Sequence, residues 1–185
     1  MDITSGIAVG VGENSHEGNL NPVTVLNHNG GTVTINTGEQ VEDATAYQIS
    51  SGSTANFNGS SVNDIRAFRA LSNQGTVNFR ESTVFTAEAT PYAYEHGLVV
   101  NEYEWEQFDR SGTLNLYGGT LNLTNTSGVT GRKDNEGNDI TVSSVLNNCG
   151  DFIMTGGTLN IEACDKVFAG INCCGTNLIL KGKNS

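Results

Sequence analysis

The sequence predicts an all-β solenoid, in which short strands coil into stacked rungs. Two observations predict this fold class: a five-residue unit recurs along the chain, and Gly, Asn and Thr make up over a third of it. The 185 residues include 23 glycines and two prolines, and 16% of them are charged. This length suits one domain, so we expect residues 1–185 to form a single solenoid domain. Both ends of the sequence look like cuts, and we expect a piece of a longer protein.

The recurring unit is Gly-Thr, or a close variant of it, followed by alternating apolar and polar residues. Its copies begin at Gly31, Ser53, Gly75, Gly112, Gly150 and Gly175. Successive copies begin 22, 22, 37, 38 and 25 residues apart. A nearly fixed interval with two longer gaps predicts about five to six rungs with two loop insertions, at about 86–109 and 124–140.

Each copy alternates apolar and polar residues with a period of two, which is the pattern of a strand with one buried face. Strands this short cannot bury that face alone, and stacking them in a solenoid closes the core. The residues expected to point inward are Val33, Phe57, Val77, Phe79, Leu114, Leu116 and Met154.

A second pattern, an apolar residue followed by Asn or Ser, precedes several copies of the unit. Stacked in successive rungs, these polar residues predict a ladder at one corner of the coil, where each side chain bonds its neighbours above and below. The expected members of this ladder are Asn27, Ser50, Ser72, Asn147 and Asn172.

A disordered low-complexity segment and a β-sandwich are the alternative fold classes. The regular register of the apolar positions argues against disorder. A sandwich does not account for one short unit that returns at a rung-like interval.

The repeated motif, with Gly119-Thr-Leu-Asn-Leu123 as its clearest form, resembles the repeats of right-handed parallel β-helix proteins of the pectin-lyase-like superfamily. It resembles most closely the passenger domains of bacterial autotransporters and surface adhesins, over about residues 23–180. The resemblance implies an extracellular or bacterial cell-surface location. It also implies a non-enzymatic adhesin module that associates with itself or binds a surface glycan or protein.

Composition excludes two classes of partner. The net charge is −11, and nine Lys and Arg residues are scattered along the chain. Nucleic-acid binding and docking on anionic lipid both need clustered cations. No apolar run approaches the roughly 18 residues of a membrane span, so we expect neither nucleic-acid binding nor membrane insertion of this chain.

The first insertion gathers aromatic and acidic residues. In an extended segment, side chains two residues apart share a face, so Tyr103 and Trp105 lie together opposite the neighbouring glutamates. Aromatic rings stack on sugars and carboxylates accept hydroxyl hydrogens. The glycan-binding residues expected from this pattern are Tyr92, Tyr94, Tyr103, Glu104 and Trp105. The alternative is that these aromatic residues pack the insertion onto the coil.

A Thr-x-Asn stripe recurs at the outward positions of the repeated unit. Its members are Thr32, Thr34, Thr54, Asn56, Thr76, Asn78, Thr113 and Asn115. A stripe poor in charge predicts side-by-side self-association through many weak hydrogen bonds. An ice-binding solenoid, with its Thr-x-Thr rows, is another interpretation, and ordinary outward residues of a solenoid strand are the third.

The four cysteines cluster late in the chain, and their spacing does not fit a zinc site. Aligning the rungs places Cys149 over Cys174, at a separation that a disulfide tolerates. We therefore expect a Cys149–Cys174 bond in an oxidising compartment, with Cys164–Cys173 as a second pair. Buried free thiols are the alternative.

The second insertion carries acidic residues that are candidate Ca²⁺ ligands, namely Asp134, Glu136 and Asp139. Their spacing does not match an EF-hand loop, and a polar hairpin turn is the alternative. No other cofactor is expected.

Enzymes of the resembled fold include polysaccharide lyases and phage tailspike hydrolases. Such enzymes need paired carboxylates, or a metal-bound cluster with a basic residue. The regular outward positions here are Thr and Asn, which do not titrate usefully. No catalytic residue is expected, and a tailspike-like or lyase fragment is the alternative function.

Overall fold

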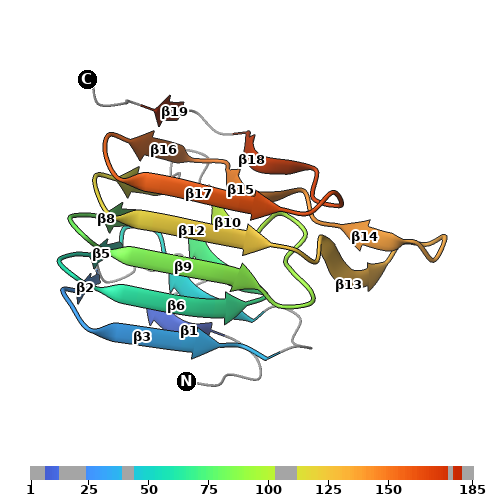
Figure 1. Cartoon of the computed structure of the whole chain (residues 1–185), viewed down its shortest axis with the longest axis horizontal. Coiled ribbons are helices and arrows are strands. Elements are labelled where there is room, and N and C mark those ends of the chain that lie inside the picture. The colour runs from blue at the N-terminus through green and yellow to red at the C-terminus, as the bar shows by residue number, and fades with distance from the viewer. Residues whose placement is uncertain (1–6, 13–23, 39–43, 103–111, 175–176, 181–185) are drawn as a thin grey trace.

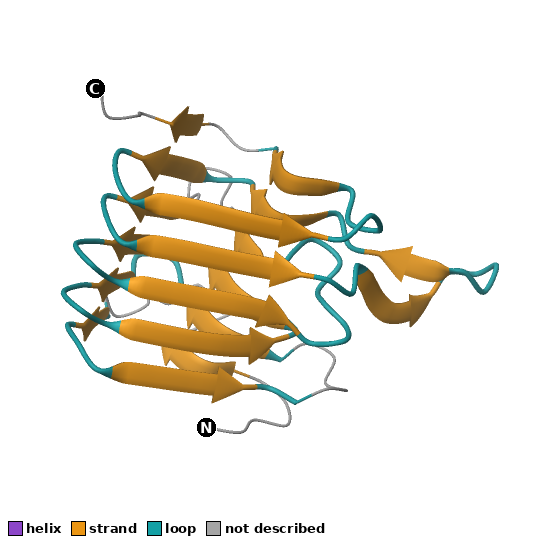
Figure 2. Cartoon of the chain, viewed as in Figure 1, coloured by secondary structure: helices purple, strands orange, loops and turns teal. Residues whose placement is uncertain are grey.

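The computed structural model describes residues 7–12, 24–38, 44–102, 112–174 and 177–180, which form a right-handed parallel β-helix (Figure 1). Each turn of the coil contributes one strand to each of three parallel sheets. Within the described residues the secondary structure consists of strands and loops (Figure 2), and no helix is long and apolar enough to cross a membrane. The predicted fold class is confirmed.

The three sheets are built from strands of successive rungs. The first sheet contains, in spatial order, β1 (Ile7–Val11), β4 (Thr45–Ile49), β7 (Arg69–Asn73), β10 (Val99–Asn101), β15 (Ser144–Asn148) and β18 (Ala169–Cys173). The second contains β2 (Val25–His28), β5 (Thr54–Phe57), β8 (Thr76–Phe79), β11 (Thr113–Leu116), β16 (Asp151–Met154) and β19 (Asn177–Leu180). The third contains β3 (Thr32–Asn36), β6 (Val62–Ala67), β9 (Val84–Ala89), β12 (Thr120–Asn125) and β17 (Thr158–Ala163).

An antiparallel hairpin projects sideways from the coil (Figure 1). It is formed by β13 (Val129–Lys133) and β14 (Asp139–Thr141) and lies within the second expected insertion. The region expected as the first insertion, 86–109, instead contains the end of β9 and all of β10. The chain therefore leaves the coil after β9 and returns to it for a strand of only three residues.

Aromatic side chains fill the middle of the coil. The Phe57 ring stacks on Phe79 at 5.1 Å between centroids, and Phe85 meets the Phe79 ring edge-on at 5.2 Å. Of the residues expected to point inward, Phe57, Val77, Phe79, Leu114 and Leu116 are fully buried. Val33 and Met154 are partly buried and pack against this core.

A buried asparagine ladder runs along the corner where the first sheet turns into the second. Asn73 donates to the Oδ1 of Asn101 at 2.7 Å, and Asn101 donates to the Oδ1 of Asn148 at 2.6 Å. The same amide groups also donate to backbone carbonyls of the second sheet, those of Thr113, Asp151 and Asn177. The ladder thus satisfies both the stacked side chains and the backbone of the corner.

The column of residues predicted for this ladder is right in part: its members from the first sheet share one register position, and Asn172 donates to Asn147 at 2.8 Å, but they do not lie at the corner. Ser72, Asn147 and Asn172 precede the inward-facing residues by one position and lie on the outer face of the first sheet. Asn27 belongs to β2 in the second sheet, and Ser50 follows β4. A shift of one residue reverses the face on which a strand side chain lies.

The first copy of the repeated unit also lies elsewhere than expected. Its strand, β3, pairs with β6 in the third sheet, whereas the copies at 54–57, 76–79 and 113–116 form the second. The glycines before the two kinds of strand have different roles. Gly31 has φ +82°, a left-handed conformation that favours glycine. At Gly112 a Cβ would collide with the backbone oxygen of Asn73 on the rung below.

Tyr47 makes the stability of the folded protein depend on pH in the alkaline range. Its side chain is 2% exposed and its hydroxyl donates to the Oδ1 of Asn63 at 2.9 Å. Burial raises the pKa of Tyr47 from its ordinary value of 10.0 to about 12.

Because the folded pKa is the higher one, the contribution of Tyr47 to stability is complete below pH 10 and is lost as the pH rises through 12. We expect the stability difference between wild type and Tyr47→Phe to change by about 2 kcal/mol over this range. Urea unfolding at pH 9 and pH 12 measures the difference, and a constant value would contradict the assignment.

Candidate functional site

A groove of about 480 Å³ opens on the outer face of the first sheet. It is the candidate functional site because it combines concavity with several polar groups. Its described lining residues are Tyr94, His96, Val100, Glu102, Asn147, Cys149, Asn172 and Cys174.

The regular stacking of strands places most of these residues. Val100, Asn147 and Asn172 occupy one register position in β10, β15 and β18, so their side chains form the floor of the groove. Residues two positions further along share the same face of a strand. This places Glu102, Cys149 and Cys174 in a second row beside the floor.

The loop between β9 and β10 supplies Tyr94 and His96. The Tyr94 amide donates to the carbonyl of Phe68 at 3.0 Å, which anchors the loop to the coil. The guanidinium carbon of Arg69 lies 4.5 Å from the centroid of the Tyr94 ring, and the His96 ring meets Tyr94 edge-on at 5.1 Å. Tyr94 is therefore held in a fixed orientation between an arginine and a histidine.

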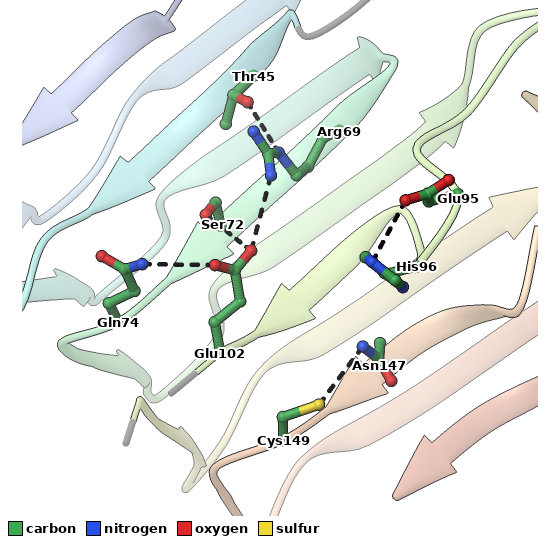
Figure 3. A network of polar contacts seen from close by, with 9 residues as sticks. All are labelled: Thr45, Arg69, Ser72, Gln74, Glu95, His96, Glu102, Asn147 and Cys149. Atoms are coloured by element: carbon green, nitrogen blue, oxygen red, sulfur yellow. Dashed lines mark hydrogen bonds and ion pairs between the residues drawn. The ribbon is translucent and has the colours of Figure 1, made fainter. Parts of the chain in front are cut away.

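Glu102 is the centre of a polar network beside the groove (Figure 3). Its carboxylate accepts hydrogen bonds from Ser72 Oγ at 3.3 Å and Gln74 Nε2 at 3.4 Å. Arg69 Nη1 lies 3.6 Å from Glu102 Oε1, and Arg69 Nε donates to Thr45 Oγ1 at 2.9 Å. These long contacts orient the carboxylate and leave it able to accept shorter bonds from a ligand.

Two stacked amides form the polar part of the floor. Asn172 Nδ2 donates to Asn147 Oδ1 at 2.8 Å, while Asn147 Nδ2 has a weak contact of 3.6 Å to Cys149 Sγ. Sulfur is a poor acceptor. The amide of Asn147 can therefore donate to a bound molecule, and among the described residues nothing donates to the Oδ1 of Asn172.

A disulfide bond joins Cys149 to Cys174 along the same row, with the two Cα atoms 4.8 Å apart. This is the pair that aligning the rungs predicts. The second predicted pair was wrong, because Cys164 and Cys173 are free. The disulfide links the ends of β15 and β18 and so fixes one wall of the groove.

Of the residues expected to bind a glycan, the structure describes Tyr92 and Tyr94, which lie in different places. Tyr94 lines the groove. Tyr92 packs on Gly131 of the β13–β14 hairpin, where an added Cβ would lie 2.8 Å from its ring. Tyr103, Glu104 and Trp105 lie outside the described residues.

The expected Thr-x-Asn stripe is only partly at the surface. Asn56 donates to Asn27, Asn78 to Asn56 and Asn115 to Asn78, at 2.8–2.9 Å, so the amides form a ladder of their own. Asn78 and Asn115 are 6% and 4% exposed.

The threonines of the stripe also divide between two sheets. Thr54, Thr76 and Thr113 are half-buried in the same sheet as these asparagines. The prediction that Thr32 and Thr34 belong to this stripe was wrong. They lie in the third sheet, beside Val62 and Asp64.

The acidic residues of the second insertion stabilise the β13–β14 hairpin. Asp134 accepts hydrogen bonds from Asn138 and from the Glu136 amide, and these bonds lower the pKa of its carboxyl. Asp139 pairs with Lys133 at 2.7 Å across the hairpin, which lowers the pKa of Asp139 as well. In the part of the chain that is described, no three His, Cys, Asp or Glu side chains lie close enough to hold a metal ion.

Comparison of the chain with models of protein families, with curated proteins and with solved structures found no match.

Proposed function

We propose that this chain is a non-enzymatic binding module of a bacterial surface or secreted adhesin, and that it holds a glycan in the groove of the first sheet. The observation that carries the proposal is the lining of that groove. The stacked rungs and the loop between β9 and β10 together present two amides, a carboxylate and an aromatic side chain on one concave face.

The chemistry of these side chains suits a sugar. Sugar hydroxyls both donate and accept hydrogen bonds, and the groove offers carboxylate and amide oxygens together with an amide donor. The side chains of Val100 and Tyr94 add apolar area for the carbon face of a ring. Because the residues stand on rigid strands and a fixed loop, little ordering is lost on binding.

One further feature supports a location outside the cell, and another supports binding without catalysis. A disulfide bond is typical of oxidising compartments, and Cys149–Cys174 stands in the groove wall. Glycoside hydrolysis uses a pair of carboxylates, whereas Glu102 is the one carboxylate among the described lining residues. The resemblance of the repeats to autotransporter passengers and pectin-lyase-like β-helices agrees with this proposal.

Self-association remains a prediction and is not part of the proposal. The asparagines of the Thr-x-Asn stripe hydrogen-bond to one another, and Asn78 and Asn115 are buried. Fewer hydrogen-bond donors and acceptors of the stripe therefore remain available to a second copy of the chain.

A glycan array followed by calorimetry tests the proposal. We expect Asn147→Ala to weaken binding of the best array ligand about tenfold, since one hydrogen bond contributes about 1 kcal/mol and the substitution also removes the acceptor of the Asn172 amide. Asn160→Ala is the matched control, because Asn160 makes the same amide-to-amide bond on the third sheet. Absence of any glycan ligand, or equal losses in both variants, would refute binding in the groove.

A further inference from the structure

The groove contains the carboxylate of Glu102, and the cation beside it, Arg69, already has several partners within the protein. Arg69 donates through Nε to Thr45, pairs through Nη1 with Glu102 and lies over the ring of Tyr94. Its guanidinium is therefore held by three neighbours, of which Figure 3 shows Thr45 and Glu102. To bind a ligand anion, Arg69 would have to leave both Glu102 and the aromatic ring.

The rest of the described lining offers an anion little compensation. It contains neither Lys nor Arg, and its histidine, His96, lies 3.5 Å from the carboxylate of Glu95. The chain as a whole carries a net charge of −11. A ligand carboxylate in the groove would therefore meet Glu102 at close range in a negative field.

From these contacts we infer that the groove selects neutral, hydroxyl-rich glycans and rejects glycans that carry carboxylate or sulfate groups. The inference rests on the proposed glycan binding and adds the charge class of the ligand. Glu102 has two roles: it accepts hydrogen bonds from sugar hydroxyls, and it repels an anionic sugar at the same position. Repulsion between like charges is a common source of specificity.

A pair of ligands that differ only in charge tests the inference. The best binder from an array holding neutral and acidic glycans is compared with a chemically converted form of itself. Primary hydroxyls of a neutral binder are oxidised to carboxylates, and carboxylates of an acidic binder are reduced to alcohols. We expect a neutral best binder and a loss of at least tenfold on oxidation, because the repulsion between two like charges about 5 Å apart near a protein surface exceeds the energy of a tenfold change even when Arg69 offsets part of it.

The variant Glu102→Gln tests the residue responsible. Glutamine keeps the shape and one acceptor oxygen, which can accept from Ser72 or from Gln74, and it removes the charge. We expect the neutral-to-acidic affinity ratio to fall by about tenfold. Glu162→Gln is the control, because Glu162 is exposed on β17 of the third sheet and its loss changes the net charge equally. We expect this control to leave the ratio unchanged.

The outcomes separate the two claims. An acidic best binder, or an unchanged ratio in a folded Glu102→Gln protein, would overturn the charge selection and leave glycan binding intact. A protein that binds no array glycan at all would overturn the proposed function itself. Equal effects of Glu102→Gln and Glu162→Gln would assign the selection to net charge and not to the groove.

Discussion

Replacing Asn101 with alanine is expected to lower the free energy of unfolding by about 3–5 kcal/mol. Asn101 is fully buried in the middle of the corner ladder. It accepts from Asn73 and donates both to Asn148 and to the backbone oxygen of Asp151. Alanine would leave the side-chain oxygen of Asn148 and the backbone oxygen of Asp151 without that donor, whereas Asn73 keeps its bond to the Thr113 carbonyl. Each buried polar group left unpaired costs about 1–3 kcal/mol.

Urea unfolding followed by circular dichroism measures this effect. Asn160→Ala is again the control, because its amide is exposed and donates to Asn122 in an outer ladder. Water replaces that bond, so we expect the control to cost less than about 1 kcal/mol. Equal destabilisation by the two variants would show that the buried ladder contributes nothing special to the corner.

The fold was predictable because its physical causes recur along the sequence. A rung has a nearly fixed length, so the repeated unit reveals the coil, and alternation with a period of two reveals which residues are inside. Phe57, Phe79 and Leu116 were assigned to the core in this way, and all are fully buried.

The assignment of strands to sheets was less predictable. A Gly-Thr unit opens strands of the second and third sheets alike, although Gly31 is needed for its positive φ and Gly112 for close packing. Both requirements select the same amino acid. The strand β10 was missed because it has only three residues and lies in the stretch 86–109, which was expected to be an insertion.

The groove was largely unpredictable from the sequence, apart from Tyr94. Its floor comes from three strands that are far apart in the chain, and each contributes one outward residue that looks ordinary by itself. A signal was present in the alignment that predicted the Cys149–Cys174 pair. The same register places Asn147 over Asn172 two residues earlier, as the predicted polar ladder had it and as the structure shows.

Loss of the Cys149–Cys174 bond is expected to cost about 3–4 kcal/mol of stability. The bond closes a loop with a sequence separation of 25 residues, and constraining the unfolded chain by a loop of this size has about that effect. The folded state also loses the link between the ends of β15 and β18. Since both cysteines line the groove, we expect the double variant Cys149→Ala/Cys174→Ala to bind its ligand more weakly as well.

Denaturant unfolding of the oxidised wild type, the double variant and Cys173→Ser measures the contribution of the bond. Cys173 is the control because it is free, exposed and adjacent to Cys174. We expect Cys173→Ser to stay near the wild-type stability and to retain ligand affinity. Hydrogen exchange then locates the change: without the bond, amides of β18 should exchange faster than those of β7, which lies deeper in the same sheet and is covered by strands on both sides. A double variant with wild-type stability and affinity would mean that strand pairing alone holds the wall of the groove.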